Sequence, residues 1–381
     1  MSTANINNKI LAWARERPGV DQNSIFSFFD KYHDWERGVS KPTFAQAKKL
    51  AQKLCIPFGF LFLSSPPIET QLTPDLRTLG DSEPNDFSVD LRAVIEDAQR
   101  KQDWYKEKII EEGAEKLSFI GKYNINNNFH DIATEIISTL GISIEDRKNE
   151  NNLLRFFTDQ TEQAGILVLR NGKVGFNTHR VLDVEEFRGF VLSDSYAPLI
   201  FINSADAAFA QIFTLVHELA HLWIGQDGVS NFALNDLNSN NKIEKFCNQV
   251  AAEVLAPEQE FRKKWQQSNG SLEERCDELQ KFFRVSTIVL ARRALDLGLI
   301  LQPEFFAYYK KLQGYWKKKK EERGGGGHFN NTFPIANSTT LTHAVCHTVY
   351  SGEMLLRNGA RLLGVKPATL NKYAENLGEM F

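Results

Sequence analysis

The sequence predicts an α+β fold, with a small three-stranded sheet beside a histidine-bearing helix and helical segments at both ends of the chain. Three observations predict this class. Apolar residues recur at helical spacing over most of the chain, whereas β-branched and aromatic runs gather between residues 151 and 203. Residues 214–223, TLVHELAHLW, are uncharged apart from one glutamate and two histidines, as a helix buried in a core requires.

The composition is that of a globular protein with several domains. A chain of 381 residues with 42% hydrophobic residues is long for one core, and it predicts two or three domains. The net charge of −3 hides an asymmetry: residues 1–67 carry +4, residues 310–381 carry +6, and the residues between them carry −13. Basic ends suit segments that meet an anionic partner such as nucleic acid, and solvated charged faces are the alternative.

Cysteine usage and the N-terminus predict a cytoplasmic protein. The four cysteines are scattered without C-x-x-C spacing, so neither a disulfide framework nor a cysteine zinc site is indicated. The start, MSTANINNKI, has no apolar signal core. No run of about eighteen apolar residues occurs, so no membrane partner is expected.

Residues 1–67 are predicted to form short amphipathic helices. The pattern WERG-x-x-x-PTFAQAKKLAQKL-x-I-P resembles an Xre-type helix-turn-helix domain. The resemblance implies that Trp35 and Glu36 follow a recognition helix close to Asn23–Tyr32, and that Pro42 opens the next helix. That recognition helix, however, is poor in the Arg, Asn and Gln that read base edges. The domain therefore either still binds DNA or is degenerate and kept for protein contact.

The next segments are predicted to be a linker, two scaffold helices and the sheet. Residues 68–90 carry prolines and few apolar residues, as an extended linker does. Residues 91–112 and 131–142 form clear amphipathic patterns. The three strands are expected within AGILVLRNGKVGFN, FRGFVLSD and APLIFINSA, and a strand edge beside the histidine helix can hold an extended peptide by backbone hydrogen bonds. Arg188 and Asn203, at the ends of these strands, are predicted to be structural.

The histidine helix has the H-E-x-x-H spacing of a zinc site. Residues i and i+4 lie on one face of a helix, so His217 and His221 can bind one Zn²⁺ from the same side. Glu218 lies one step round the helix, where its carboxylate can take a proton from water at the metal. An ordinary buried helix that carries two histidines by chance is the alternative.

A catalytic zinc needs a third protein ligand, and the candidates lie in EKFCNQVAAEVLAP, residues 244–257. This segment is helical by its apolar spacing and ends at Pro257. Glu244 and Glu253 are the two candidate ligands. Glu244 is favoured, because Asn248 follows one turn later and can orient a neighbouring ligand.

The two helices together resemble the ImmA/IrrE family of zinc metallo-endopeptidases, whose second helix reads roughly E-x-x-A-N-x-F-A-x-x-L-L-M-P. The resemblance covers residues 91–305, implies a zincin-like core, and places the third ligand on Glu244. The chain departs from the family pattern at Cys247, Val250 and Ala256. These departures change packing volume and leave the metal ligands in place.

The end of the chain is predicted to be a basic linker followed by helices. Residues 306–331 include KKKKEERGGGG and are expected to form a Gly-rich linker, rather than a nest of amides facing an anion. Residues 332–381 are expected to form a helical C-terminal domain, since A-x-L-L-G-V-x-x-x-T-L has the cadence of a short helix-turn-helix. His343 and His347 lack a nearby general base and are predicted to be structural.

The predicted function is zinc-dependent cleavage of a partner protein, with Glu218 as the general base. His179, Tyr196 and His130 are candidates for the donor that stabilises the oxyanion. The family resemblance implies a repressor or a toxin as the partner, in a bacterial or phage circuit. The alternative is an antitoxin or transcriptional regulator that binds a toxin or operator DNA, with a structural metal site. Self-association as a homodimer is compatible with either function.

Overall fold

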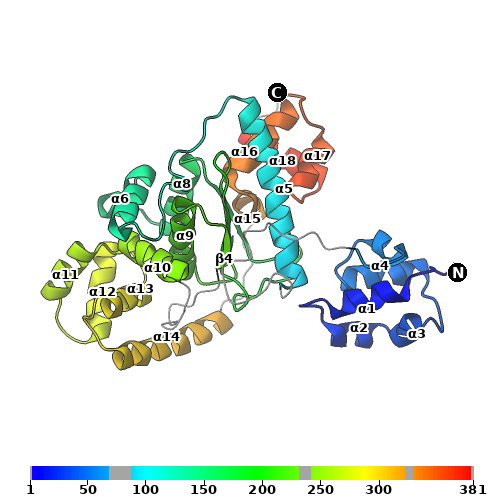
Figure 1. Cartoon of the computed structure of the whole chain (residues 1–381), viewed down its shortest axis with the longest axis horizontal. Helices are drawn as coiled ribbons and strands as arrows, with labels where there is room; N and C mark the ends of the chain where they lie inside the picture. Colours follow the sequence, from blue (N-terminus) through cyan, green and yellow to red (C-terminus); the bar gives the residue numbers. More distant parts are fainter. Residues whose placement is uncertain (1, 68–86, 149, 231–241, 323–328, 379–381) are drawn as a thin grey trace. The chain divides into compact units, whose positions relative to one another are not determined.

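The computed structural model describes the whole chain except residues 1, 68–86, 149, 231–241, 323–328 and 379–381 (Figure 1). The described residues group into two compact units, the first running to Glu96 and the second beginning at Asp97. The boundary falls inside α5, Val89–Glu111. Most of the predicted 68–90 linker lies outside the described residues, and its last two residues, Val89 and Asp90, begin this helix.

The first unit is a small helical bundle. It consists of α1 (Asn8–Glu16), α2 (Gln22–Phe28), α3 (Tyr32–Glu36), α4 (Phe44–Lys53) and the 3₁₀ helix η1 (Phe58–Phe62). Polar residues begin three of the helices: Asn7 and Asp21 accept hydrogen bonds from the first turns of α1 and α2, and Thr43 forms a capping box with Gln46 on α4. The core is apolar and includes Ile10, Leu11, Tyr32, Trp35 and Leu50.

The predicted recognition helix, Asn23–Tyr32, is wrong as a single helix. α2 ends at Phe28 and α3 begins at Tyr32, with Asp30 in the turn between them. After this break Trp35 packs edge-on against Phe29 at 5.4 Å between ring centroids, and both rings lie in the core. Because of this break, the rings of Phe29 and Trp35 pack in one apolar core, an arrangement that helical spacing in the sequence does not indicate.

The second unit is an α+β assembly around one small sheet. Its helices before the C-terminal segment are the second part of α5, α6 (Phe129–Leu140), α7 (Ile144–Arg147), α8 (Leu153–Gln163), α9 (Ala208–Trp223), α10 (Lys242–Leu255), α11 (Glu258–Gln267), α12 (Leu272–Phe283), α13 (Thr287–Asp296) and α14 (Gln302–Glu322). Much of the apolar core of this unit is built around α9. At the C-terminal end of that helix, the ring of Trp223 stacks on Phe119 with 4.4 Å between centroids.

The sheet has four strands where three were predicted. The strands β1 (Leu167–Asn171), β2 (Gly189–Leu192), β3 (Leu199–Asn203) and β4 (Gly228–Ser230) are ordered β1-β3-β2-β4. β1 pairs parallel to β3, and β2 pairs antiparallel to both β3 and β4. The additional strand, β4, lies outside the three segments in which strands were predicted, because three residues are too few to show a strand period.

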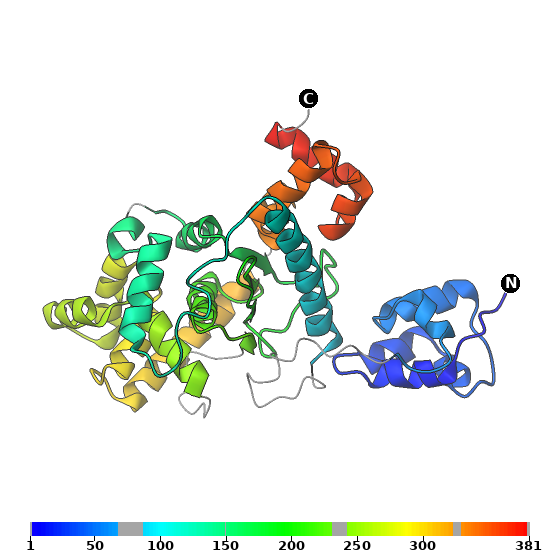
Figure 2. The same cartoon turned by 45° about the horizontal axis from the view of Figure 1, so that its top comes forward.

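Helices cover the sheet, with α8 and α9 on one side and α5 and the C-terminal helices towards the other (Figures 1 and 2). Gln102 of α5 donates hydrogen bonds to the carbonyl oxygens of Leu192 and Ala197, at 2.9 and 2.8 Å. α9 lies against β2 and β3, so it is enclosed between the sheet and α10. This placement accounts for the near absence of charge along residues 214–223.

The C-terminal segment folds onto the sheet. It contains α15 (Phe329–Asn337), α16 (Thr339–Tyr350), α17 (Leu356–Leu362) and α18 (Pro367–Leu377), and α15 packs against β1. The buried carboxylate of Glu162, on α8, accepts hydrogen bonds from the backbone amides of Thr339 and Thr340 at the start of α16. The helices expected beyond residue 332 are therefore present, and the contact grouping places them in the second unit.

The predicted linker at 306–331 is partly wrong. α14 continues to Glu322 through the lysine run, since Lys and Glu are strong helix formers and no glycine follows until residue 324. The four glycines, 324–327, lie outside the described residues. Among the described residues, no helix is both long and apolar enough to cross a membrane.

Candidate metal centre

The two histidines of α9 lie side by side in the interior of the second unit. His217, Glu218 and His221 are all fully buried, because the surrounding residues of this helix are apolar and face the sheet and α10. One helical turn separates the two imidazoles, and their Nε2 atoms are 3.0 Å apart.

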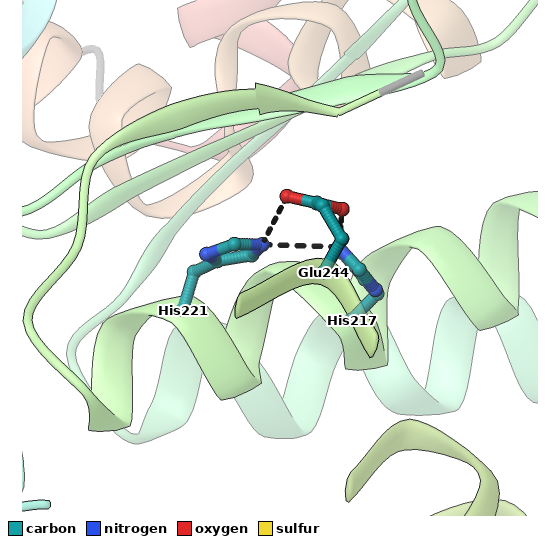
Figure 3. A group of neighbouring side chains, drawn as sticks. All are labelled: His217, His221 and Glu244. Carbon is teal, nitrogen blue, oxygen red and sulfur yellow. Dashed lines mark hydrogen bonds and ion pairs between the residues drawn. The ribbon is translucent and has the colours of Figure 1, made fainter. Parts of the chain in front are cut away.

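The carboxylate of Glu244, in the first turn of α10, lies beside both imidazoles (Figure 3). Its Oε2 is 3.1 Å from Nε2 of His217, and its Oε1 is 3.4 Å from Nε2 of His221. The three side chains form a buried cluster of metal-ligand type. α9 and α10 thus bring together residues that are more than twenty positions apart in the sequence.

The spacing of the three donors fits a tetrahedral zinc ion. Zinc binds imidazole nitrogen and carboxylate oxygen at about 2.0–2.2 Å, so neighbouring donors on a tetrahedron lie about 3.3–3.5 Å apart. The two Nε2 atoms are 3.0 Å apart, and each lies 3.1 or 3.4 Å from one of the two Glu244 oxygens, so these separations are close to such edges. Two histidines and one glutamate also form a donor set that leaves a fourth position open, as catalytic zinc sites require.

A second residue of α10 orients the first histidine. Nδ1 of His217 lies 3.0 Å from Oδ1 of Asn248, one turn after Glu244. Because an amide oxygen only accepts, Nδ1 carries the proton and the lone pair of Nε2 points towards Glu244 and His221. This is the orienting contact that the sequence predicted for Asn248.

Burial and mutual charge set the protonation of the cluster in the absence of metal. Burial lowers the pKa of His217, which favours the neutral imidazole that a metal binds. Burial also acts to lower the pKa of His221. The combined effect of Cys247 and Glu244 is larger, so the pKa of His221 is raised. Burial alone would raise the pKa of the Glu244 carboxyl, yet the two histidines hold that pKa well below its usual range.

The Glu218 carboxylate is buried against the sheet. Burial raises its pKa to about 8, with the negative charge of Glu244 acting in the same direction and His221 acting against it. Neither carboxylate oxygen has a hydrogen-bond partner within the described residues. A Cβ added at Gly189 of β2 would lie 2.9 Å from Oε1 of Glu218 and 2.6 Å from Cγ2 of Thr214. Only glycine fits at that point, and no local pattern in the sequence indicates this requirement.

Glu253, the alternative third ligand, lies in a different group of side chains. It forms an ion pair with Arg293, accepts a hydrogen bond from the backbone amide of Glu258 at 3.1 Å, and lies 3.2 Å from Nδ1 of His130. Its carboxylate therefore links α10 to α13 and α6. His130, one of the candidates for stabilising the oxyanion, is therefore a partner of Glu253.

The remaining predicted residues have structural contacts. The backbone amide of His179 donates to Asn177, and the ammonium of Lys116 lies 5.7 Å from the centroid of the Tyr196 ring. Arg188 forms an ion pair with Asp206, and the buried side chain of Asn203 donates to the carbonyl oxygen of Phe187 at 3.1 Å. His343 lies 3.5 Å from the hydroxyl of Tyr373.

Comparison with known families gives two matches. The family model described as the IrrE N-terminal-like domain, of the peptidase group M78, matches residues 161–295. A domain of unknown function matches residues 337–376, which include all of α16 and α17 and all but the last residue of α18. No curated protein and no solved structure matches the chain. The segment that carries His217, Glu218, His221 and Glu244 is thus matched by a metallopeptidase family model, and this match supports the ImmA/IrrE type.

Proposed function

We propose that the protein is a zinc-dependent endopeptidase that cleaves a partner protein in the cytoplasm, in a bacterial or phage regulatory circuit. The observation that carries this proposal is the convergence of His217, His221 and Glu244, with the buried carboxylate of Glu218 next to the first histidine in the chain. The partner is a repressor or a toxin, as the family type implies.

His217, His221 and Glu244 would hold the zinc, and Asn248 would keep the first imidazole in the correct tautomer. A zinc ion bound there supplies a Lewis acid that activates water towards a peptide carbonyl. Glu218 takes the proton of the attacking water and returns it to the leaving amine.

The substrate would lie along β4. This strand pairs with β2 on one side and is last in the sheet order, so its other edge faces away from the sheet. An extended peptide can pair with such an edge through its backbone, and side-chain pockets then select the sequence. Since β4 ends at Ser230, beside the Glu218 carboxylate, a peptide paired there would pass the proposed base.

Metal analysis of purified variants tests the ligand set. The wild type is expected to bind one zinc ion per chain, and His217→Ala and Glu244→Ala are expected to lose it. Glu253→Ala is the matched control, since its carboxylate is held by Arg293, and it is expected to retain zinc in the folded fraction. Loss of zinc from the Glu253 variant with retention in the Glu244 variant would reverse the assignment.

Glu218→Gln tests the hydrolytic role separately from the metal. The variant is expected to bind zinc like the wild type, while cleavage of the partner slows by about a hundredfold or more, because a general base contributes at least that factor. Cleavage is measured on the partner by gel electrophoresis and mass spectrometry. Unchanged cleavage would remove Glu218 from the mechanism, and unchanged toxin neutralisation without any cleavage would favour a regulator.

A second candidate function, binding of a regulatory partner, is favoured by the surface of the first unit. Phe28, Phe44, Phe58 and Phe62 are between 38% and 52% exposed, an unusual concentration of aromatic surface. Three of these rings lie together, with the Phe58–Phe62 centroids 5.2 Å apart. Residues 41–63 carry four lysines and no acidic residue, and two of these lysines lie over the ring of Phe28.

Apolar rings with surrounding lysines suit an acidic, apolar segment of a partner protein better than the base edges of DNA. Phe44→Ser with Phe62→Ser is expected to abolish co-purification with the protein encoded by the neighbouring gene. Lys48→Ala with Lys49→Ala is expected to weaken it and to make it less sensitive to salt. A gel shift with the chain's own upstream DNA that survives the phenylalanine changes but fails with the lysine changes would favour operator binding instead.

A further inference from the structure

A buried polar contact lies between β4 and α9, next to the proposed metal site. In the sheet register, Gly189 of β2 is paired directly with Ser230 of β4. Residues directly opposite each other on an antiparallel pair place their side chains on the same face of the sheet. The face of the sheet towards which a Cβ on Gly189 would point is therefore also the face towards which the Ser230 side chain points.

The geometry at Gly189 shows which face this is. A Cβ added to Gly189 would lie 2.9 Å from Oε1 of Glu218 and 2.6 Å from Cγ2 of Thr214, and both of these atoms belong to α9. The side chain of Ser230 must then also point towards α9. Ser230 is 1% exposed, so its hydroxyl is enclosed there.

The polar atoms in this space are complementary. The hydroxyl of Ser230 and both carboxylate oxygens of Glu218 are buried without a hydrogen-bond partner among the described residues. Leaving such groups unpaired is unfavourable, and more so when the group is charged. An ionised carboxylate only accepts and a hydroxyl can donate, so once Glu218 is ionised a hydrogen bond between the two groups has one possible direction.

We propose that Ser230 is a positioning residue for Glu218, an inference that rests on the proposed peptidase function. Its hydroxyl donates to one carboxylate oxygen and leaves the other oxygen directed towards the metal site, where it accepts the proton of the attacking water. Gly189 provides the space that this arrangement needs, because any side chain there would displace the carboxylate. The short strand β4 thereby holds the base from the edge of the sheet.

A substrate-independent probe tests the positioning. Acetohydroxamic acid would bind zinc as acetohydroxamate, through its two oxygens, with its acidic proton passing to a carboxylate at the position of a general base. Its affinity for the zinc-loaded full chain is measured by calorimetry, and zinc affinity is measured separately by competition with a chromophoric chelator. Glu218→Gln is expected to weaken acetohydroxamate strongly and to leave zinc affinity unchanged.

Ser230→Ala is expected to weaken acetohydroxamate by about tenfold, in line with the loss of one hydrogen bond to a charged group, with no change in zinc affinity. Ser230→Thr keeps the hydroxyl and is expected to restore binding to within about threefold of the wild type, a rescue that a purely structural role of this position would not produce. Gly189→Ala adds a methyl group that displaces the Glu218 carboxylate, so it is expected to weaken acetohydroxamate binding as Ser230→Ala does. The serine pair carries the test alone if Gly189→Ala does not fold.

The two possible failures are distinguishable. Equal acetohydroxamate affinity of the wild type and Ser230→Ala, with weakened binding by Glu218→Gln, would overturn the positioning role and leave the peptidase function standing. A zinc-loaded wild type whose affinity does not depend on Glu218 would overturn the proposed function, and with it the role of Ser230. Loss of zinc from Ser230→Ala would also overturn the inference, because it would place the serine in support of the metal ligands.

Discussion

Without zinc, the Glu218→Gln variant is expected to be more stable than the wild type at pH 8, by on the order of 4 kcal/mol. The carboxyl group of Glu218 is fully buried, and its pKa of about 8 lies far above the ordinary value of 4.5. Between these two pH values the folded protein holds a proton that the unfolded chain releases. The free energy of unfolding therefore falls as the pH rises from 4.5 to 8, and a neutral glutamine removes this loss.

The same argument sets the pH dependence of the difference. Near pH 4.5 the folded wild type still holds the proton and the unfolded chain is only beginning to release it, so the two proteins are expected to be almost equally stable there. Urea unfolding at pH 5 and pH 8, with zinc removed by a chelator, measures the free energy of unfolding at both ends. A difference of the same size at both values would mean that packing, rather than ionisation, separates the two proteins.

Glu244→Gln is the matched control, with the opposite sign. The pKa of Glu244 is held below its ordinary value by His217 and His221 despite burial, so its ionised form stabilises the fold. That stability is present above the ordinary pKa and is lost as the pH falls through the lowered one. The glutamine variant is accordingly expected to be less stable than the wild type at pH 8. Two neighbouring carboxylates in one site thus predict opposite changes for the same substitution.

The parts of the site that lie on helices can be predicted from the sequence. The H-E-x-x-H spacing places two imidazoles on one helical face by local geometry alone. Glu244 is favoured over Glu253 as the third ligand because Asn248 follows it by one helical turn. In the structure Asn248 contacts His217, whereas Glu253 contacts Arg293. A helix has a fixed period, so residues on one helix, and those a turn apart on the next, can be related before the fold is known.

Contacts across strands could not be predicted in the same way. Ser230 and Gly189 face each other because β4 pairs with β2 in one register, and a strand of three residues shows no period that would reveal it. The same limit explains the other differences. The break between α2 and α3 follows from rings packing in a shared core, and the continuation of α14 follows from helix propensity in a lysine run that resembles a solvated linker.

The other large expected effect concerns Arg293, whose removal leaves Glu253 buried without its charged partner. Arg293 is 4% exposed, forms an ion pair with Glu253, and donates from Nε to the carbonyl oxygen of Ala256 at 2.9 Å. Breaking a buried pair by removing one partner costs about 3–5 kcal/mol. Arg293→Ala is therefore expected to lower the free energy of unfolding of the second unit by about that amount, as measured by urea unfolding.

Arg262→Ala is the control for this change. Arg262 pairs with Glu258 at 2.7 Å near the same cluster, but its side chain is 43% exposed, so water replaces the lost contact and the expected cost is below about 1 kcal/mol. Both variants are expected to bind one zinc ion per folded chain, since neither arginine contributes to the group of His217, His221 and Glu244. Equal stability losses for the two arginines would show that the Glu253 cluster is hydrated. Loss of zinc from folded Arg293→Ala would show instead that Glu253 and the metal site are coupled through α10, the helix that carries both acidic residues.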